Sequence, residues 1–168
     1  FRMVCSSGTR TRDKHHILSN LDKSIDFKDV TEDYACLGIM GPHSRSLMTD
    51  LAGDIFNTDQ FPFTTGKHIN INDVKLWAQR LSYVGELGWE LHHPMNQIEK
   101  LYESLMDSGN QYNITNFGTY AVNSLRIEKA YKGWGSELTG EISLVEADMY
   151  RFYNLTKKNN FIGAKAIK

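Results

Sequence analysis

The chain has 168 residues, of which 40% are hydrophobic and 11% aromatic, and it carries 19 Lys and Arg against 20 Asp and Glu. A chain of this length forms roughly one domain and buries enough surface to fold without covalent staples. The net charge of -1 lacks the basic excess typical of nucleic-acid binding. No apolar stretch approaches the ~20 residues that cross a bilayer. Composition therefore predicts a globular domain with neither nucleic acid nor membrane as its partner.

The cysteines and the first residues indicate the compartment and the extent of the chain. Cys5 and Cys36 lack the Cys/His spacing of a zinc site, and neither a disulfide framework nor a metal site is expected. A reducing compartment fits best, either the cytoplasm or, in a eukaryote, the mitochondrial matrix. The chain starts at Phe1 without the regions of a signal peptide, so we expect an internal fragment of a longer protein.

The first part of the chain alternates strand and helix patterns. Residues 33–40 are β-rich and stop at Gly41-Pro42, which suits a helix start, while Leu47 and Leu51 then share one helical face. The predicted order is a strand at 1–4, a helix at 9–21, a strand at 33–40, a helix from 42 through 51 and a loop at 57–66.

The second part is richer in strands at first and then helical. Residues 95–106 place Ile98, Leu101 and Leu105 on one face, which predicts a helix. The predicted order is strands at 68–71 and 74–81 joined at Asn72-Asp73, a strand at 89–92, helices at 95–106 and 119–130, a long irregular segment, and a helix start within 161–166. These β-α and β-β-α units predict an α+β fold with ferredoxin-like β-α-β pieces.

The stretch from Tyr83 to Leu91 carries the strongest chemical signal. It contains no nucleophile motif and no phosphate-binding glycine loop, and neither occurs elsewhere in the chain. Its two glycines let the backbone turn sharply, and Glu90 follows the aromatic Trp89 on a strand, as if to face a planar ligand. A hairpin in which Glu86 and Glu90 are merely solvated fits the same spacing. Both interpretations stay open on spacing alone.

Longer motifs carry a family resemblance. Residues 83–91 and 116–135 resemble the folate-binding aminomethyltransferase family, which includes the T-protein of glycine cleavage, and above all its dimethylglycine and sarcosine dehydrogenase members. Residues 37–42 resemble the family's apolar strand before a Gly-Pro helix start, and residues 161–163 its closing motif. The resemblance implies that residues 1–168 are the later half of a folate-binding domain, with the upstream part and any FAD domain outside this sequence.

The family's chemistry implies a tetrahydrofolate site. An upstream FAD domain oxidises an N-methyl amine, and the released carbon unit is captured as methylenetetrahydrofolate. The resemblance therefore implies a dimethylglycine dehydrogenase-like oxidoreductase or aminomethyltransferase, with the amine and folate as small-molecule partners. The family's catalytic acidic residue precedes the equivalent of Phe1, so no catalytic residue is assigned and the fragment alone is expected to be inactive.

Four residues match positions that contact folate in this family, and a fifth candidate, Arg151, departs from the family pattern. Glu90 matches the carboxylate that accepts the pterin ring N–H and exocyclic amino group together. Tyr83, Leu91 and His92 match positions that line the pocket, as a stacking face and polar contacts, although ordinary strand packing also explains them. Arg151 stands where the dehydrogenases have Tyr; it either reaches the glutamate tail or is a solvated cation.

Two alternative functions remain open. One is a non-catalytic regulatory module of the same fold, similar to the regulatory subunit of pyruvate dehydrogenase phosphatase, because a fold does not fix a function. The other is a plain aminomethyltransferase. Val122 stands where that branch has an Arg that pairs with the folate, so the dehydrogenase branch is favoured.

Overall fold

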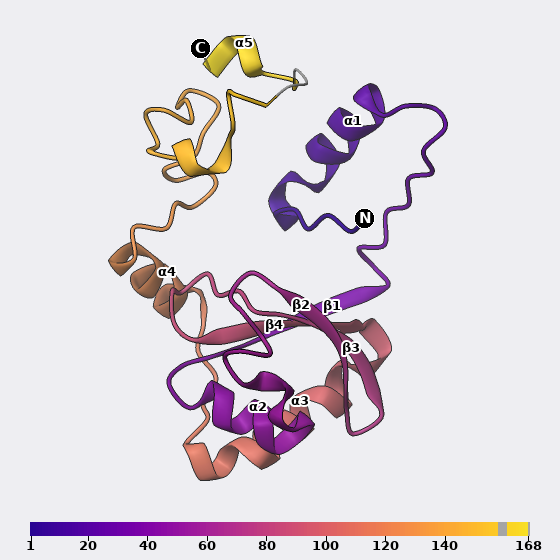
Figure 1. Cartoon of the computed structure of the whole chain (residues 1–168), viewed down its shortest axis with the longest axis vertical. Coiled ribbons are helices and arrows are strands. Elements are labelled where there is room, and N and C mark those ends of the chain that lie inside the picture. Colours follow the sequence, from indigo (N-terminus) through magenta and orange to yellow (C-terminus); the bar gives the residue numbers. More distant parts are fainter. Residues whose placement is uncertain (158–160, 168) are drawn as a thin grey trace. The chain divides into compact units, whose positions relative to one another are not determined.

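The computed structural model describes residues 1–157 and 161–167 and divides the chain into two compact units, Phe1–Lys129 and Ala130–Lys168. The helices and strands, labelled in Figure 1, are α1 (Arg10–Asn20), β1 (Tyr34–Met40), α2 (Ser44–Ala52), β2 (Gly66–Ile71), β3 (Val74–Gln79), β4 (Gly88–Pro94), α3 (Ile98–Gly109), α4 (Thr119–Glu128) and α5 (Ala164–Ile167). No helix in the described part of the chain is long and apolar enough to span a membrane.

The first unit is built on a four-stranded antiparallel sheet with the strand order β1-β4-β3-β2 (Figure 1). β2 and β3 form a tight hairpin through Asn72 and Asp73, whose φ angles of 44° and 67° suit a two-residue turn with the twist of the strands. β4 follows later in the chain and inserts between β1 and β3. β4 is therefore, like β3, an interior strand with a neighbouring strand on each side.

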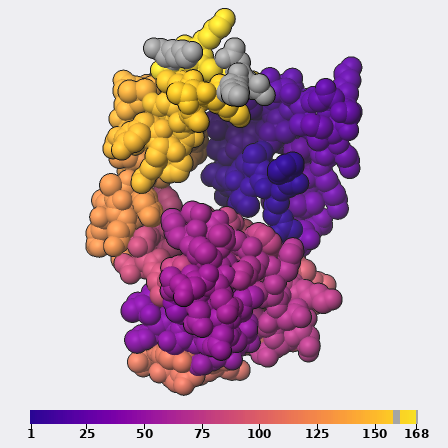
Figure 2. Space-filling model, in the orientation of Figure 1, coloured from indigo at the N-terminus to yellow at the C-terminus, as the bar shows by residue number. Residues whose placement is uncertain are grey.

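One face of this sheet packs against α2 and α3, and the buried apolar residues of all these elements form a single core. Leu91 lies at its centre, opposite Leu37 on β1 and Ala78 on β3. Trp89 is also fully buried and meets the ring of Phe56 edge to face, with 5.1 Å between ring centroids. Figure 2 shows part of the outer surface of this unit, in magenta and pink. Side chains alternate along a strand, so Glu90 and His92 lie on the other face.

The second unit is turn-rich, as its glycines predict. The Gly133 carbonyl accepts hydrogen bonds from the backbone N–H groups of Ser136, Glu137 and Leu138, and the Glu137 carboxylate accepts the Gly133 N–H at 2.7 Å. A single bridge joins Trp134 and Leu138. The predicted closing helix start is present as α5.

The α+β class is confirmed, and β1, α2 and β2 follow one another in the expected β-α-β order. The strand predicted at residues 1–4 is wrong, since these residues are exposed and have no strand partner to satisfy an extended backbone. The helix predicted at 119–130 ends at Glu128, because Ala130 adopts a left-handed φ of 56° that stops a helix. Residues 158–160 and 168 lie outside the described residues.

Candidate functional site

The site builds on the middle of β4. Glu90 faces Gly38 of β1 and Gln79 of β3, and His92 faces Cys36 and Trp77 in the same two strands. Because residues two apart on a strand share a face, Glu90 and His92 point to the same side of the sheet, away from the apolar core. The Glu90 side chain is 25% exposed and that of His92 9%. The sheet therefore presents a carboxylate to solvent with an almost buried imidazole beside it.

These side chains interact directly. His92 Nε2 lies 3.4 Å from Glu90 Oε2 and 4.0 Å from Cys36 Sγ. Two hydrogen bonds raise the pKa of His92 to about 9, the one to the Cys36 thiol contributing most and the one to the Glu90 carboxylate second. Burial acts in the opposite direction. At neutral pH the imidazole is therefore a cation that donates its Nε2 proton between a carboxylate and a sulfur atom. The arrangement holds the Glu90 carboxylate in place.

The other candidates on this unit occupy different positions. Tyr83 lies in the loop between β3 and β4 and is 40% exposed. Leu91 is fully buried in the core, so only its backbone can contact a ligand on the side of Glu90. The roles of Tyr83 and Leu91 in folate binding stay predictions. For Leu91 the predicted contact is limited to its backbone.

Arg151 belongs to the second unit, in the single turn Tyr150–Phe152. Its guanidinium lies 5.3 Å from the centroid of the Phe152 ring, in a cation-π arrangement. A contact from Arg151 to the glutamate tail of a folate stays a prediction.

Trp89 does not face the same side as Glu90. Its ring is buried against Phe56 and Phe61 in the core, so the interpretation of Trp89 as an aromatic neighbour of a planar ligand is wrong. The reason is strand alternation, which sends consecutive residues to opposite faces. Trp77, opposite His92 on β3, is the tryptophan on the side of Glu90, and the sequence analysis missed it.

The interpretation that both glutamates are merely solvated fits Glu86 but not Glu90. β3 and β4 do pair antiparallel, and Glu86 lies in the loop that connects them, 42% exposed and 3.7 Å from Lys129 Nζ. Glu86 is thus an ordinary surface carboxylate. Glu90 is instead half-buried on a central strand and held by His92, which favours a binding role.

A cavity of about 330 Å³ opens elsewhere in the first unit, between the end of β1, the start of α2 and the end of α3. Leu37, Ile39, Leu105 and Ile114 contribute to its mainly apolar wall, and Glu90 and His92 do not line it. The paired polar groups and the cavity are therefore separate features.

Comparison with known sequences identifies the family to which a chain with this fold and site belongs. The model of the GCVT N-terminal domain matches residues 1–157. The chain belongs to this family, which confirms the resemblance to the aminomethyltransferases of glycine cleavage and their relatives.

Individual relatives are similar to most or all of the chain. It is 36% identical to mitochondrial dimethylglycine dehydrogenase of Mus musculus over all of this chain, and 32% identical to mitochondrial sarcosine dehydrogenase of Homo sapiens over 90% of it. It is also 30% identical to the mitochondrial pyruvate dehydrogenase phosphatase regulatory subunit of Mus musculus over 87% of it. The chain spans 20%, 17% and 17% of these relatives. The relatives include enzymes of the dehydrogenase type.

Proposed function

We propose that this chain is part of a folate-dependent dehydrogenase of N-methyl amines, of the dimethylglycine or sarcosine type. In this proposal residues 1–168 are the later half of the folate-binding domain, and an FAD domain upstream in the same protein oxidises the amine. The folate-binding domain then captures the carbon unit as methylenetetrahydrofolate. The 36% identity to a dimethylglycine dehydrogenase along the whole chain supports this reading.

The observation that carries the proposal is the Glu90 carboxylate, which is partly exposed on a central strand and lies 3.4 Å from His92 Nε2. A carboxylate has two oxygen atoms, which together accept a ring N–H and the neighbouring amino group of a pterin. The residues present fit such a group. Tetrahydrofolate, when bound, supplies the nitrogen atoms that accept the one-carbon unit.

The other residues of the chain position that ligand. His92 holds the carboxylate in one orientation, and its protonated ring offsets the negative charge that the pocket would otherwise concentrate. Tyr83 offers an exposed ring for stacking. Holding the ligand in this way contributes to catalysis through orientation.

The proposal extends to the compartment. The dehydrogenase relatives are named mitochondrial, and a matrix location for a eukaryotic source agrees with two cysteines that form no disulfide. In a bacterial source the corresponding compartment is the cytoplasm.

A second candidate is a non-catalytic regulatory module. The identity of 30% to the pyruvate dehydrogenase phosphatase regulatory subunit favours it, because that relative shares the family without being named a dehydrogenase. A plain aminomethyltransferase is third. Val122 on α4 has no charge with which to pair a folate carboxylate in that branch's manner.

Calorimetric titration of the full-length protein with folinic acid tests the proposal. Glu90→Gln removes the charge but keeps the shape, and loss of the charged pair of hydrogen bonds is expected to cost about 2 kcal/mol, or roughly thirtyfold in affinity. Glu86→Gln is the matched control, since it makes the same chemical change in the neighbouring loop and is expected to bind normally. Equal affinities for both variants would contradict the role of Glu90. A wild type that binds no folinic acid would favour the regulatory module.

A further inference from the structure

Three side chains with metal-binding atoms converge on the open face of the sheet. The sulfur of Cys36, a carboxylate oxygen of Glu90 and a ring nitrogen of His92 all lie within 4.8 Å of one another. Among residues 1–157 and 161–167 it is the one group of three or more His, Cys, Asp or Glu side chains whose ligand atoms lie close enough together to share a metal ion. It combines three different donors, unlike a cluster of surface acids.

We propose that Cys36, Glu90 and His92 form a binding site for a single divalent metal ion of the zinc class. β1 and β4 run side by side (Figure 1). Their register sets Cys36 directly opposite His92. Glu90 lies two residues from His92 on the same strand and the same face. Regular strand pairing thus brings the three donors together without any change in the backbone.

The two distances from His92 are close to those around a tetrahedral ion. With metal bonds of about 2.0–2.1 Å to nitrogen and oxygen and about 2.3 Å to sulfur, the ligand atoms stand roughly 3.3 Å (nitrogen to oxygen) and 3.6 Å (nitrogen to sulfur) apart. The observed separations are 3.4 Å between His92 Nε2 and Glu90 Oε2, and 4.0 Å between His92 Nε2 and Cys36 Sγ. The Cys36 sulfur and the Glu90 carboxylate oxygen lie within 4.8 Å of each other, against roughly 3.6 Å around one tetrahedral ion. Closing all three atoms onto one ion therefore takes a movement of up to about 1 Å, which the exposed Cys36 and partly exposed Glu90 side chains can make.

The donor chemistry selects the type of metal. Thiolate and imidazole ligands favour zinc and related ions over Mg²⁺ and Ca²⁺, which prefer oxygen. One thiolate and one carboxylate balance the two positive charges of the ion. Binding releases two protons to solvent, that of the Cys36 thiol and that on His92 Nε2. Three protein ligands leave a fourth position open, the pattern of reactive rather than structural zinc sites.

Access supports the same conclusion. Cys36 is exposed and the Glu90 side chain is 25% exposed, so an ion can enter from solvent, while the imidazole is fixed by its burial. The site shares Glu90 with the proposed folate pocket. If the proposed function holds, a bound ion and a pterin compete for this carboxylate. The metal site itself does not depend on folate binding.

Cobalt titration of the full-length protein tests the site. The protein is reduced, stripped with a chelator and titrated with Co²⁺, whose bond to a thiolate gives a charge-transfer band and whose tetrahedral coordination gives intense visible bands. The expected result is that this site binds one Co²⁺ ion per protein molecule, so that its bands stop growing at that ratio. Added Zn²⁺ should then displace the Co²⁺ and remove these bands. Cys36→Ser is expected to remove the contribution of this site and to weaken Zn²⁺ binding by about a hundredfold or more, since even second-shell losses cost about 10–100-fold.

Controls make the result decisive. Cys5→Ser changes the other exposed cysteine and is expected to leave the cobalt spectrum as in the wild type. Circular dichroism of Cys36→Ser checks that the sheet is intact. Identical cobalt spectra for wild type and Cys36→Ser would overturn the proposal, as would a band that Cys5→Ser removes.

Folinic acid titration of the metal-free and the Zn²⁺-loaded wild type separates the two proposals. Weaker folinic acid binding with Zn²⁺ supports the sharing of Glu90. Cobalt bands without any folinic acid binding would leave the metal site standing and contradict the proposed function. Folinic acid binding without thiolate bands from Cys36 would support the proposed function and contradict the metal site.

Discussion

The sheet with α2 and α3 and the N-terminal segment 1–33 are stabilised by different forces. The sheet buries a continuous apolar core that includes Trp89, Leu91 and Leu101. In the N-terminal segment, helix α1 has no buried residue, and charged side chains connect it to the loop that follows. Burial survives changes of salt and pH, while exposed ion pairs do not. The two regions should therefore respond differently to the same perturbation.

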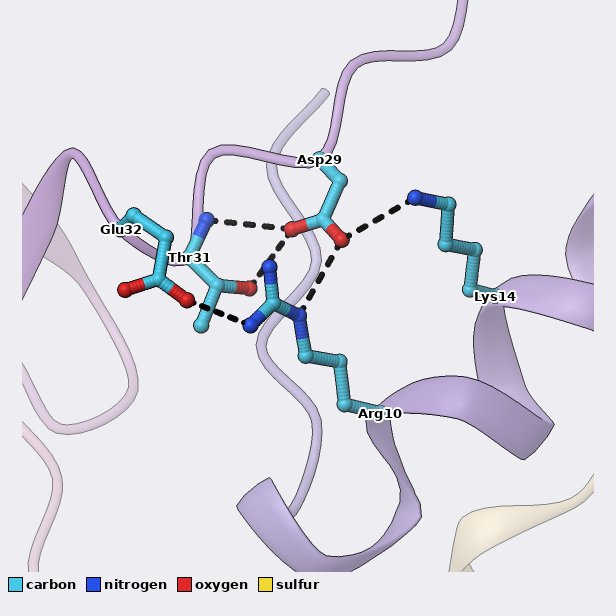
Figure 3. Close-up of polar contacts among 5 residues, drawn as sticks. All are labelled: Arg10, Lys14, Asp29, Thr31 and Glu32. Carbon is cyan, nitrogen blue, oxygen red and sulfur yellow. Dashed lines mark hydrogen bonds and ion pairs between the residues drawn. The ribbon is translucent and has the colours of Figure 1, made fainter.

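Figure 3 shows the polar network of the N-terminal segment. Asp29 accepts hydrogen bonds from the hydroxyl and the backbone N–H of Thr31, at 2.7 and 3.1 Å, and from Arg10 Nε at 3.2 Å. Lys14 lies 3.4 Å from the same carboxylate, and Arg10 also reaches Glu32 at 2.6 Å. One carboxylate thus joins α1 to the loop, and this part of the chain depends on its charge.

The largest expected effect comes from a cavity in the core. Leu101→Ala removes a fully buried side chain of α3 and should lower the free energy of opening of the β3 and β4 amides by about 2–5 kcal/mol. Leu18→Ala makes the same change on α1, where the side chain is 50% exposed, and should cost about 0.5 kcal/mol or less. Hydrogen exchange of the full-length protein measures both. Similar losses in both variants would contradict the contrast between the regions.

The same contrast explains what the sequence could reveal. Leu101 and Leu105 recur at helical spacing, and Asn72-Asp73 marks a hairpin, so local patterns sufficed for α3 and for the β2–β3 turn. Cys36 and His92 are 56 residues apart, and their contact follows from the insertion of β4 beside β1. No local pattern carries that information.

The sequence also did not predict which side chains of β4 face the core and which face solvent. The sequence placed Trp89 and Glu90 next to each other, yet only the position of the core decides which of the two faces solvent. Glu90 itself could be named because a motif of the family marks it. Its partner Cys36 belongs to no such motif, and alternation along β1 identifies it only once the register with β4 is known.

A second prediction concerns the contact between β1 and β4. A Cβ at Gly88 would stand 2.5 Å from the carbonyl oxygen of Ile39, and this backbone atom cannot move aside without disturbing the strand pair. Gly88→Ala should therefore destabilise the β1–β4 pair by about 1–3 kcal/mol. Gly140→Ala, where a Cβ meets nothing within 4 Å, is the matched control. Amide exchange in residues 34–40 reports the effect, and equal exchange in both variants would show that β1 tolerates the methyl group.

A smaller effect is expected in the N-terminal segment. Arg10→Ala removes both ion pairs of that side chain, to Asp29 and Glu32, and should speed amide exchange in residues 10–33 while leaving β4 unchanged. Because the pairs are exposed, the effect should be modest and should shrink in high salt. Lys28→Ala breaks a single exposed pair with Asp33 and should do less. Faster exchange in β4 would mean that the segment and the sheet are coupled.

The smallest effect is a pH dependence confined to the same segment. Hydrogen bonds from the Thr31 hydroxyl and backbone N–H, followed by that from Arg10, hold the pKa of Asp29 well below its usual range. A carboxyl group whose pKa is lower in the folded state stabilises that state fully above the unfolded value of about 3.9, and this contribution is lost as the pH falls below it. The N-terminal segment should therefore loosen in acid before the apolar sheet does.

Asp29→Asn isolates that carboxylate. The amide oxygen can still accept the two hydrogen bonds from Thr31, but it carries no charge and does not titrate. At neutral pH the variant should show the faster exchange of residues 10–33 that the wild type reaches only in acid, and its own exchange, corrected for intrinsic rates, should change less between pH 5 and pH 3. A wild-type Asp29 carboxyl that titrates in its usual range by NMR would show that the network does not hold it. The segment would then owe its position to contacts other than this carboxylate.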